Sequence, residues 1–357
     1  MARSVNTKIT ELFNIKIPII SAPMAYATTP ALVAEVIKGG GLGFLGAGAE
    51  PAPKIAQAID EARALLSPEL QRVVGMGFVG WVLDKLNTDA DPRFQAALDK
   101  APSAIFLAYG PDLNKYVTQV RAFDASSGRK TFVFVTVNTV QEAVRAANDW
   151  KADVLVAQGA EAGGRGSVYS PPTAQFLKDV LAALPGGPPV VAAGGITTGQ
   201  QIAAQLAAGA AGVVLGTRLL FTEECMYSDE MKDVLVRAGP DTTARSTAYD
   251  LAFPPGVWPD GIQARCVNNA IVTEFASGAS PEERKANIAK GDRDHLIVYA
   301  GVGVADTSEI KKTADVMKTL HEETVAALEK SAPHLLGGAH ITSRQPSSLS
   351  GHLRSRL

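Results

Sequence analysis

Between residues 17 and 216, eight short apolar runs alternate with amphipathic segments, and this rhythm constrains the fold more than any other feature. The runs are nearly continuous in Val, Ile, Leu, Phe and Ala, which is typical of parallel strands that are buried on both faces. We therefore predict strands at residues 17–22, 42–45, 73–78, 104–108, 131–135, 154–157, 190–193 and 213–215.

The segments between these runs have the apolar spacing of helices, and several begin with Thr, Asp or Pro, which favour a helix start. They lie at residues 30–38, 53–66, 92–100, 114–123, 139–150, 173–184 and 199–208. Eight strands with helices between them predict an α/β fold of the (β/α)8, or TIM barrel, type. A doubly wound open sheet is the alternative, and the count of eight favours the barrel.

The alternation of apolar runs and amphipathic segments stops after Thr217, so we predict additional segments outside the barrel. The barrel should occupy residues 1–221, and residues 222–300 should form a helical insert, or lid, over one of its ends. Residues 301–336 should contain a C-terminal helix, from Asp306 to Lys330, that packs on the barrel. Residues 337–357 are rich in Gly, Ser and Pro and should form a flexible tail.

Composition excludes several classes of protein. The chain has 357 residues, of which 46% are hydrophobic, so it has enough apolar mass for a large core. A formal net charge of −2 argues against binding to the phosphate backbone of nucleic acids. No run approaches the roughly 18 apolar residues of a membrane span. The two cysteines form no disulfide framework, and the histidines lack metal-ligand spacing.

The ends of the last two predicted barrel strands favour a phosphate site. One strand runs into Gly194-Gly195, and the next runs into Gly216-Thr217. Glycines at adjacent strand ends let backbone N–H groups approach an anion, and TIM barrels commonly bind phosphate at this place. Ordinary glycine turns are the alternative.

Two other strand ends carry groups that suit a flat ring. The first strand ends in Ala22-Pro23-Met24, which can offer main-chain groups to such a ring. The sixth ends at Gln158, whose amide can bond a heteroaromatic edge, and Gly163-Gly164 allow a tight loop beneath a ligand. Arg165 follows and would bring a positive charge into the mouth of the site, unless it is a surface residue.

Taken together, these segments resemble the nitronate monooxygenase family, formerly called 2-nitropropane dioxygenases. The resemblance rests on Ala22-Pro23-Met24, on the Gln158–Gly164 segment QGAEAGG, on Ala193–Ile196 and on Leu215-Gly216-Thr217, and it runs from about residue 8 to about residue 330. It implies an FMN-dependent oxidoreductase that oxidises alkyl nitronates with O2. The residues that it implies for FMN are Ala22, Pro23, Met24, Gly77, Gln158, Gly163, Gly164, Gly194, Gly195, Leu215, Gly216 and Thr217.

The sequence departs from the family's motif at two positions. Where the motif has EAGGH, with the His as catalytic base, this chain has EAGGR, and its five histidines all lie at or after His295. Arginine stays protonated and cannot act as a general base. Arg165 could instead stabilise an anion, such as a nitronate that is already ionised. At the third strand end, Gly77 stands where the family often has Asn.

Three alternatives remain open. Related flavin barrels include NAD(P)H-dependent reductases of quinones or enoyl groups, so NAD(P)H is a second candidate partner. The missing His also fits a flavin-binding protein without catalysis. A phosphate-binding barrel without flavin is the third alternative.

Some residues outside these motifs also suggest a role. Tyr26, Tyr109 and Tyr169 lie near strand ends and are candidates for a substrate pocket. The final Ser355-Arg356-Leu357 resembles a peroxisomal import signal and would bind an import receptor. We therefore expect a peroxisomal protein if the source is a eukaryote and a cytoplasmic one otherwise.

Overall fold

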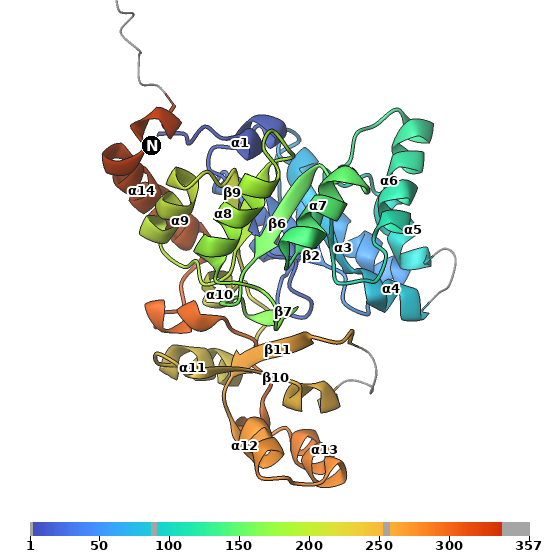
Figure 1. The fold of residues 1–357 in the computed structure, drawn as a ribbon, viewed down its shortest axis with the longest axis vertical. Helices are drawn as coiled ribbons and strands as arrows, with labels where there is room; N and C mark the ends of the chain where they lie inside the picture. The colour runs from blue at the N-terminus through green and yellow to red at the C-terminus, as the bar shows by residue number, and fades with distance from the viewer. Residues whose placement is uncertain (1–2, 87–90, 253–257, 338–357) are drawn as a thin grey trace, which may run out of the picture.

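A barrel of eight parallel strands, wrapped by helices, forms the centre of the structure (Figure 1), a computed structural model that describes residues 3–86, 91–252 and 258–337. The strands are β1 (Ile19–Ser21), β2 (Gly43–Gly46), β3 (Val74–Val79), β4 (Ala104–Ala108), β5 (Phe132–Val137), β6 (Val154–Gln158), β8 (Val190–Ala193) and β9 (Gly212–Leu215). They neighbour one another in the order β1-β9-β8-β6-β5-β4-β3-β2. The predicted strands are confirmed, with small shifts at their ends.

The sheet closes where β1 meets β2. The amide of Leu42 donates to the carbonyl of Ile19, and the amide of Ser21 donates to the carbonyl of Leu42, both at 2.9 Å. The Ser21 hydroxyl then accepts from the amide of Phe44, also at 2.9 Å. Closure rules out the open doubly wound sheet and places all eight carboxyl ends at one rim of the barrel.

Aromatic side chains fill part of the barrel interior. Phe44 of β2 packs edge-on against Phe106 of β4 and Phe134 of β5, with ring centroids 5.3 and 5.2 Å apart. Phe13 of the N-terminal helix α1 (Lys8–Phe13) contacts Phe134 at 5.8 Å. All these rings are buried, so the barrel centre is a packed core rather than a channel.

The helices that wrap the barrel match the predicted segments. They are α2 (Pro30–Lys38), α3 (Ala52–Ala64), α5 (Pro92–Asp99), α6 (Asn114–Ser127), α7 (Val140–Asn148), α8 (Thr173–Ala183) and α9 (Gly199–Ala207). Thr29, Thr139 and Thr198 cap three of them, because each hydroxyl accepts from a first-turn amide. Two short helices were not predicted: α1 and α4 (Gly80–Leu86). No helix in the described ranges is long and apolar enough to cross a membrane.

The C-terminal helix α14 (Thr313–Ser331) starts later than predicted. Asp306 does not begin it, because the Asp306 carboxylate instead accepts from the side chains of Thr197 and Gln201 beside α9. Thr313 begins the helix, and both its amide and its hydroxyl donate to Glu224, at 2.9 and 2.8 Å. The helix then packs along α9. Apart from Gly337, the predicted tail with Ser355-Arg356-Leu357 lies outside the described residues.

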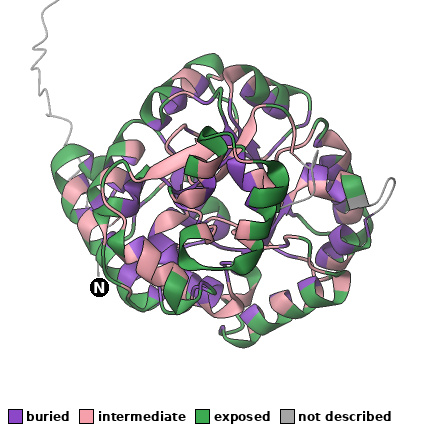
Figure 2. Cartoon of the chain, turned by 90° about the horizontal axis from the view of Figure 1, so that it is seen from below, coloured by how far each residue is buried: buried purple, intermediate pink, exposed green. Residues whose placement is uncertain are grey.

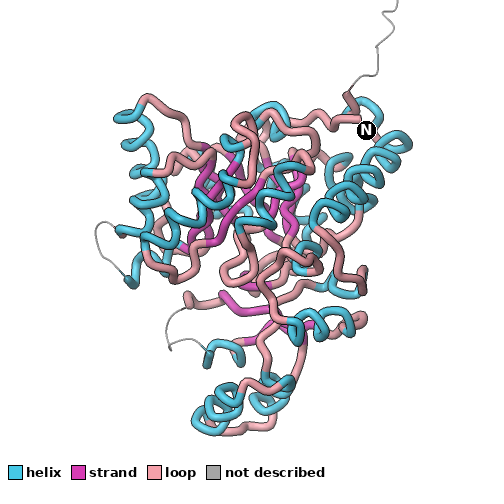
Figure 3. The backbone as a smooth tube through the Cα atoms, turned by 180° about the vertical axis from the view of Figure 1, so that it is seen from behind, coloured by secondary structure: helices cyan, strands magenta, loops and turns pink. Residues whose placement is uncertain are grey.

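The lid is not purely helical, and this corrects the prediction for residues 222–300. It contains α11 (Asp229–Arg237), α12 (Ala270–Ala276) and α13 (Pro281–Lys290), but also strands β10 (Thr243–Ser246) and β11 (Ile262–Val267). These two strands form an antiparallel sheet with β7 (Gly164–Ser167), which is part of the loop after β6. Figures 1 and 3 show this lid sheet between the barrel and helices α12 and α13.

The lid has a small core of its own on the side away from the barrel. Tyr249, Ala264, Cys266 and Ile271 are buried together there. His295 links α12 to the segment after α13, because its two ring nitrogens contact Glu274 at 2.9 Å and Asp292 at 2.7 Å. These hydrogen bonds raise the pKa of His295. Figure 2, seen from the lid side, shows the lid lying across the ring of barrel helices.

Candidate active site

Four neighbouring strands bring most of the predicted site residues together. The strands β1, β9, β8 and β6 are consecutive in the sheet, and because they are parallel their carboxyl ends share one rim. Residues at these ends are partly accessible, although the strands before them are almost wholly buried. They are Ala22, Pro23 and Met24 after β1, Gly216 and Thr217 after β9, Gly194 and Gly195 after β8, and Gln158 with Gly163 at and after β6.

Backbone amides at two of these ends lack partners. Among the described residues, the N–H groups of Gly195, Gly216 and Thr217 have no hydrogen-bond acceptor. Gly194 and Gly195 have φ values of +117° and +67°, which favour glycine. An anion such as a phosphate would satisfy these amides. Leu215 is buried and supports the neighbouring turn, since its carbonyl accepts from the amide of Ala22 at 2.9 Å.

The turn after β1 rests on Gly77. A Cβ atom at Gly77 would overlap the ring of Pro23, so glycine lets that proline pack over the end of β3. Gly77 is buried, and its carbonyl accepts from the amide of Ala47 at 2.9 Å. Its structural role is therefore to seat Pro23.

A hydrogen-bond network fixes the side chain of Gln158. Its amide oxygen accepts from the hydroxyl of Tyr109 at 2.7 Å and from the amide of Asn138 at 3.0 Å. Its own NH2 donates to the carbonyl of Arg165 at 3.2 Å. Burial raises the pKa of Tyr109 to about 12, so this hydroxyl stays protonated at neutral pH. Asn138 was not predicted, although it directly follows β5 and a reading of that strand end would have found it.

The three predicted tyrosines have different surroundings. Tyr109 lies inside the Gln158 network. Tyr26 is 52% exposed, and its hydroxyl accepts from the amide of Ala49 at 3.2 Å. Tyr169 is 71% exposed and lies over Gly261 of the lid. Of the three, Tyr109 is therefore the one that the structure joins to the strand-end residues.

The structure gives Arg165 partners in the lid, where the prediction had placed its charge in the mouth of the site. On β7 it is paired with Ala264, a residue of the lid core, so its side chain shares the face of the lid sheet that is turned away from the barrel. Its guanidinium forms an ion pair with Asp250 and lies 4.0 Å from the ring centroid of Trp258. The side chain is only 8% exposed. Neighbouring Gly164 begins β7 with a φ of +67°.

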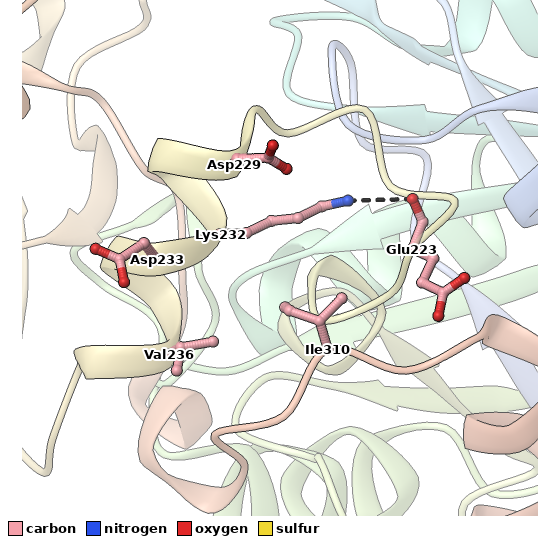
Figure 4. A pocket seen from close by; sticks show the side chains of 6 residues that line it. All are labelled: Glu223, Asp229, Lys232, Asp233, Val236 and Ile310. Atoms are coloured by element: carbon pink, nitrogen blue, oxygen red, sulfur yellow. Dashed lines mark hydrogen bonds between the residues drawn. The ribbon is translucent and has the colours of Figure 1, made fainter.

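A surface pocket of about 490 Å³ lies apart from these strand ends. Figure 4 shows its lining residues, Glu223, Asp229, Lys232, Asp233, Val236 and Ile310. Lys232 crosses it and donates to the carbonyl of Glu223 at 3.1 Å. None of the predicted site residues lines this pocket, so we do not assign the chemistry to it.

Comparison with known proteins identifies the family. A family model described as nitronate monooxygenase matches residues 6–71 and 86–323. The chain belongs to the nitronate monooxygenase family. A nitronate monooxygenase of Metarhizium robertsii, npaC, is 31% identical over 343 residues, covering 89% of this chain and 93% of that protein. A nitronate monooxygenase of Neurospora crassa is 29% identical and covers 87% and 90%.

Solved structures agree with membership of the nitronate monooxygenase family. FabK from Thermotoga maritima has a TM-score of 0.75 at 25% identity and covers 92% of this chain and 98% of its own. A nitroalkane oxidase from Streptomyces ansochromogenes has a TM-score of 0.71 at 28% identity, with coverage of 90% and 99%. The relatives' names describe oxidoreductases, so this chain is an enzyme of that class.

Proposed function

We propose that this member of the nitronate monooxygenase family uses FMN to oxidise alkyl nitronates with O2. The observation that carries the proposal is the set of free amides at Gly195, Gly216 and Thr217, which lie beside the accessible end of β1. A flavin mononucleotide has both a phosphate for such amides and a flat ring for the neighbouring turn. The proposal thus gives one ligand to all four strand ends.

The residues at the rim fit FMN by their chemistry. Gly194, Gly195, Gly216 and Thr217 would hold the phosphate, while Ala22, Pro23 and Met24 would lie against the ring. Gln158 would offer its amide, whose orientation the bonds from Tyr109 and Asn138 already fix. Fixed donors cost little to reorganise when a ligand binds. Bound FMN would supply the redox chemistry, including the reaction with O2.

The side chains at the rim favour a substrate that is already ionised. Tyr109 holds its proton at neutral pH, and Arg165 is paired with Asp250 and cannot accept a proton. The described histidines, His295, His321 and His334, lie in the lid, on α14 and after α14. An alkyl nitronate needs no base, because its carbon has already lost the proton. A neutral nitroalkane would need one.

One relative favours a second candidate function. A dehydrogenase of Mycobacterium tuberculosis that acts on a carboxyl-CoA compound is 28% identical over 274 residues, covering 76% of this chain and 69% of that protein. Its name supports a redox reaction other than nitronate oxidation. The second candidate is therefore a reductase that uses NAD(P)H with a quinone or enoyl substrate.

Turnover assays separate the two functions. With FMN-loaded protein, we expect an alkyl nitronate to bleach the flavin absorbance without O2 and to cause O2 uptake in air. We expect the neutral parent nitroalkane to react more slowly, because none of the described histidines follows a barrel strand to serve as its base. If NADPH bleaches the flavin rapidly and nitronate neither bleaches it nor causes O2 uptake, the second function replaces the first.

A further inference from the structure

Two arginines of the lid sheet point toward the barrel. Arg245 of β10 stands directly opposite Arg265 of β11 in the strand register. Both guanidinium groups reach the carbonyl of Ala160 in the loop after β6, at 3.4 and 3.1 Å, and Arg245 also donates to the carbonyl of Ala162 at 2.7 Å. They therefore lie on the face of the lid sheet opposite to the one that holds Arg165.

Gly166 on β7 makes room for Arg245. Gly164 is paired with Arg265, and Gly166 is paired with Gln263, so both glycines share the barrel-facing side. A Cβ atom at Gly166 would come within 2.6 Å of the Arg245 guanidinium. The Arg245 side chain can therefore extend across β7 toward the loop after β6.

No ion pair within the described part of the chain neutralises the charge of Arg245 and Arg265. Like charges directly opposite each other on neighbouring strands are unfavourable. Arginine ion pairs in the described ranges involve six other arginines, and neither Arg245 nor Arg265 takes part in one. The charge of Glu161 acts on Arg265, but its carboxylate accepts from the amide and hydroxyl of Thr173, at 2.8 and 2.7 Å.

The charge also lies near the Gln158 network. Burial and the charge of Arg265 lower the pKa of Arg245 to about 10, so Arg245 remains charged at neutral pH. The Arg245 guanidinium donates to the carbonyls of Ala160 and Ala162, which follow Gln158 in the loop after β6. Both arginines are partly accessible.

We propose that Arg245 and Arg265 form the subsite that binds the anionic group of the substrate at the barrel mouth. Two planar guanidinium groups suit a planar anion with two oxygens, such as the nitronate group. The inference rests on the proposed function for its substrate, and it assigns charge recognition to Arg245 and Arg265 instead of Arg165. Arg245 and Arg265 thereby favour the ionised substrate over its neutral parent.

The test compares Arg245→Gln and Arg265→Gln with a matched control. The control is Arg237→Gln, at a lid arginine on α11 that is exposed and paired with Asp233. In FMN-loaded protein, calorimetry measures the binding of nitrate, a planar anion that cannot be oxidised. Steady-state assays measure KM for ethyl nitronate and for neutral nitroethane. We expect nitrate affinity to fall about tenfold or more and KM for the nitronate to rise similarly, as for loss of a charged hydrogen bond.

The remaining results separate charge recognition from other roles. KM for nitroethane should change little in the Gln variants, and Arg237→Gln should match the wild type throughout. If KM rises equally for nitronate and nitroethane, the arginines only position the loop after β6, and the proposal is overturned. Unchanged nitrate affinity would overturn it as well. Should a Gln variant fail to fold, Arg245→Lys keeps the charge and should show a smaller loss. Nitrate binding that depends on Arg245, in a protein that oxidises no nitronate, would support the anion subsite while refuting the proposed function.

Discussion

Replacing Gly216 by valine should weaken FMN binding strongly and leave the barrel folded. A Cβ atom at Gly216 would lie 3.7 Å from the sulfur of Met24 and 3.8 Å from the Cβ of Ala22, which are ordinary contacts. The fold therefore has space for a side chain, but that space lies between the ends of β9 and β1, where the account places the cofactor. Loss of two phosphate hydrogen bonds would weaken FMN binding by about a hundredfold or more.

Fluorescence titration of the apoprotein with FMN, together with thermal unfolding, measures both effects. Gly239→Val is the matched control, since a Cβ there would lie 3.9 Å from Thr242 in a lid loop far from the rim. It should bind FMN like the wild type. A Gly216→Val protein with normal FMN affinity would show that the cofactor does not use the end of β9.

Replacing Arg165 by methionine should loosen the lid and should not alter the recognition of the substrate's charge. The change keeps much of the side-chain length but leaves Asp250 without its cation and removes the contact with Trp258. Breaking a buried pair costs about 3–5 kcal/mol, and because the Asp250 side chain is 28% exposed we expect about 2 kcal/mol. Hydrogen exchange should show faster opening of β7 and β11. Urea unfolding should measure the decrease in the free energy of unfolding.

Two further variants sharpen this test. Arg293→Met removes an exposed lid arginine that is paired with Asp233 and should cost less than about 1 kcal/mol. The double variant Arg165→Met/Asp250→Leu removes both charges and should recover part of the stability. The account of Arg165 is wrong if the single variant keeps normal lid stability but raises KM for the nitronate.

The barrel could be predicted because its signals are local. Each strand is a short apolar run, and each capping threonine such as Thr29 or Thr139 precedes its own helix. The lid sheet could not be predicted in this way. β7 reads Gly-Arg-Gly-Ser and β10 reads Thr-Ala-Arg-Ser, so neither carries an apolar run, and β7 pairs with a strand nearly a hundred residues away.

The site residues likewise divide into those that local sequence predicts and those that depend on strand pairing. Gly194, Gly195, Gly216 and Thr217 could be placed together, because parallel strands end at one rim. The direction of Arg165 could not be predicted, since it depends on the register between β7 and β11, and a shift of one residue would reverse it. Arg245 and Arg265 lie in a segment that was expected to be helical, so nothing in the sequence placed them opposite each other.

A crystal structure of the protein with bound FMN tests the central claim most directly. The account predicts that the phosphate accepts hydrogen bonds from the amides of Gly195, Gly216 and Thr217, with the ring against Pro23 and Met24. A flavin bound elsewhere, or these amides covered by protein groups while FMN is present, would contradict it.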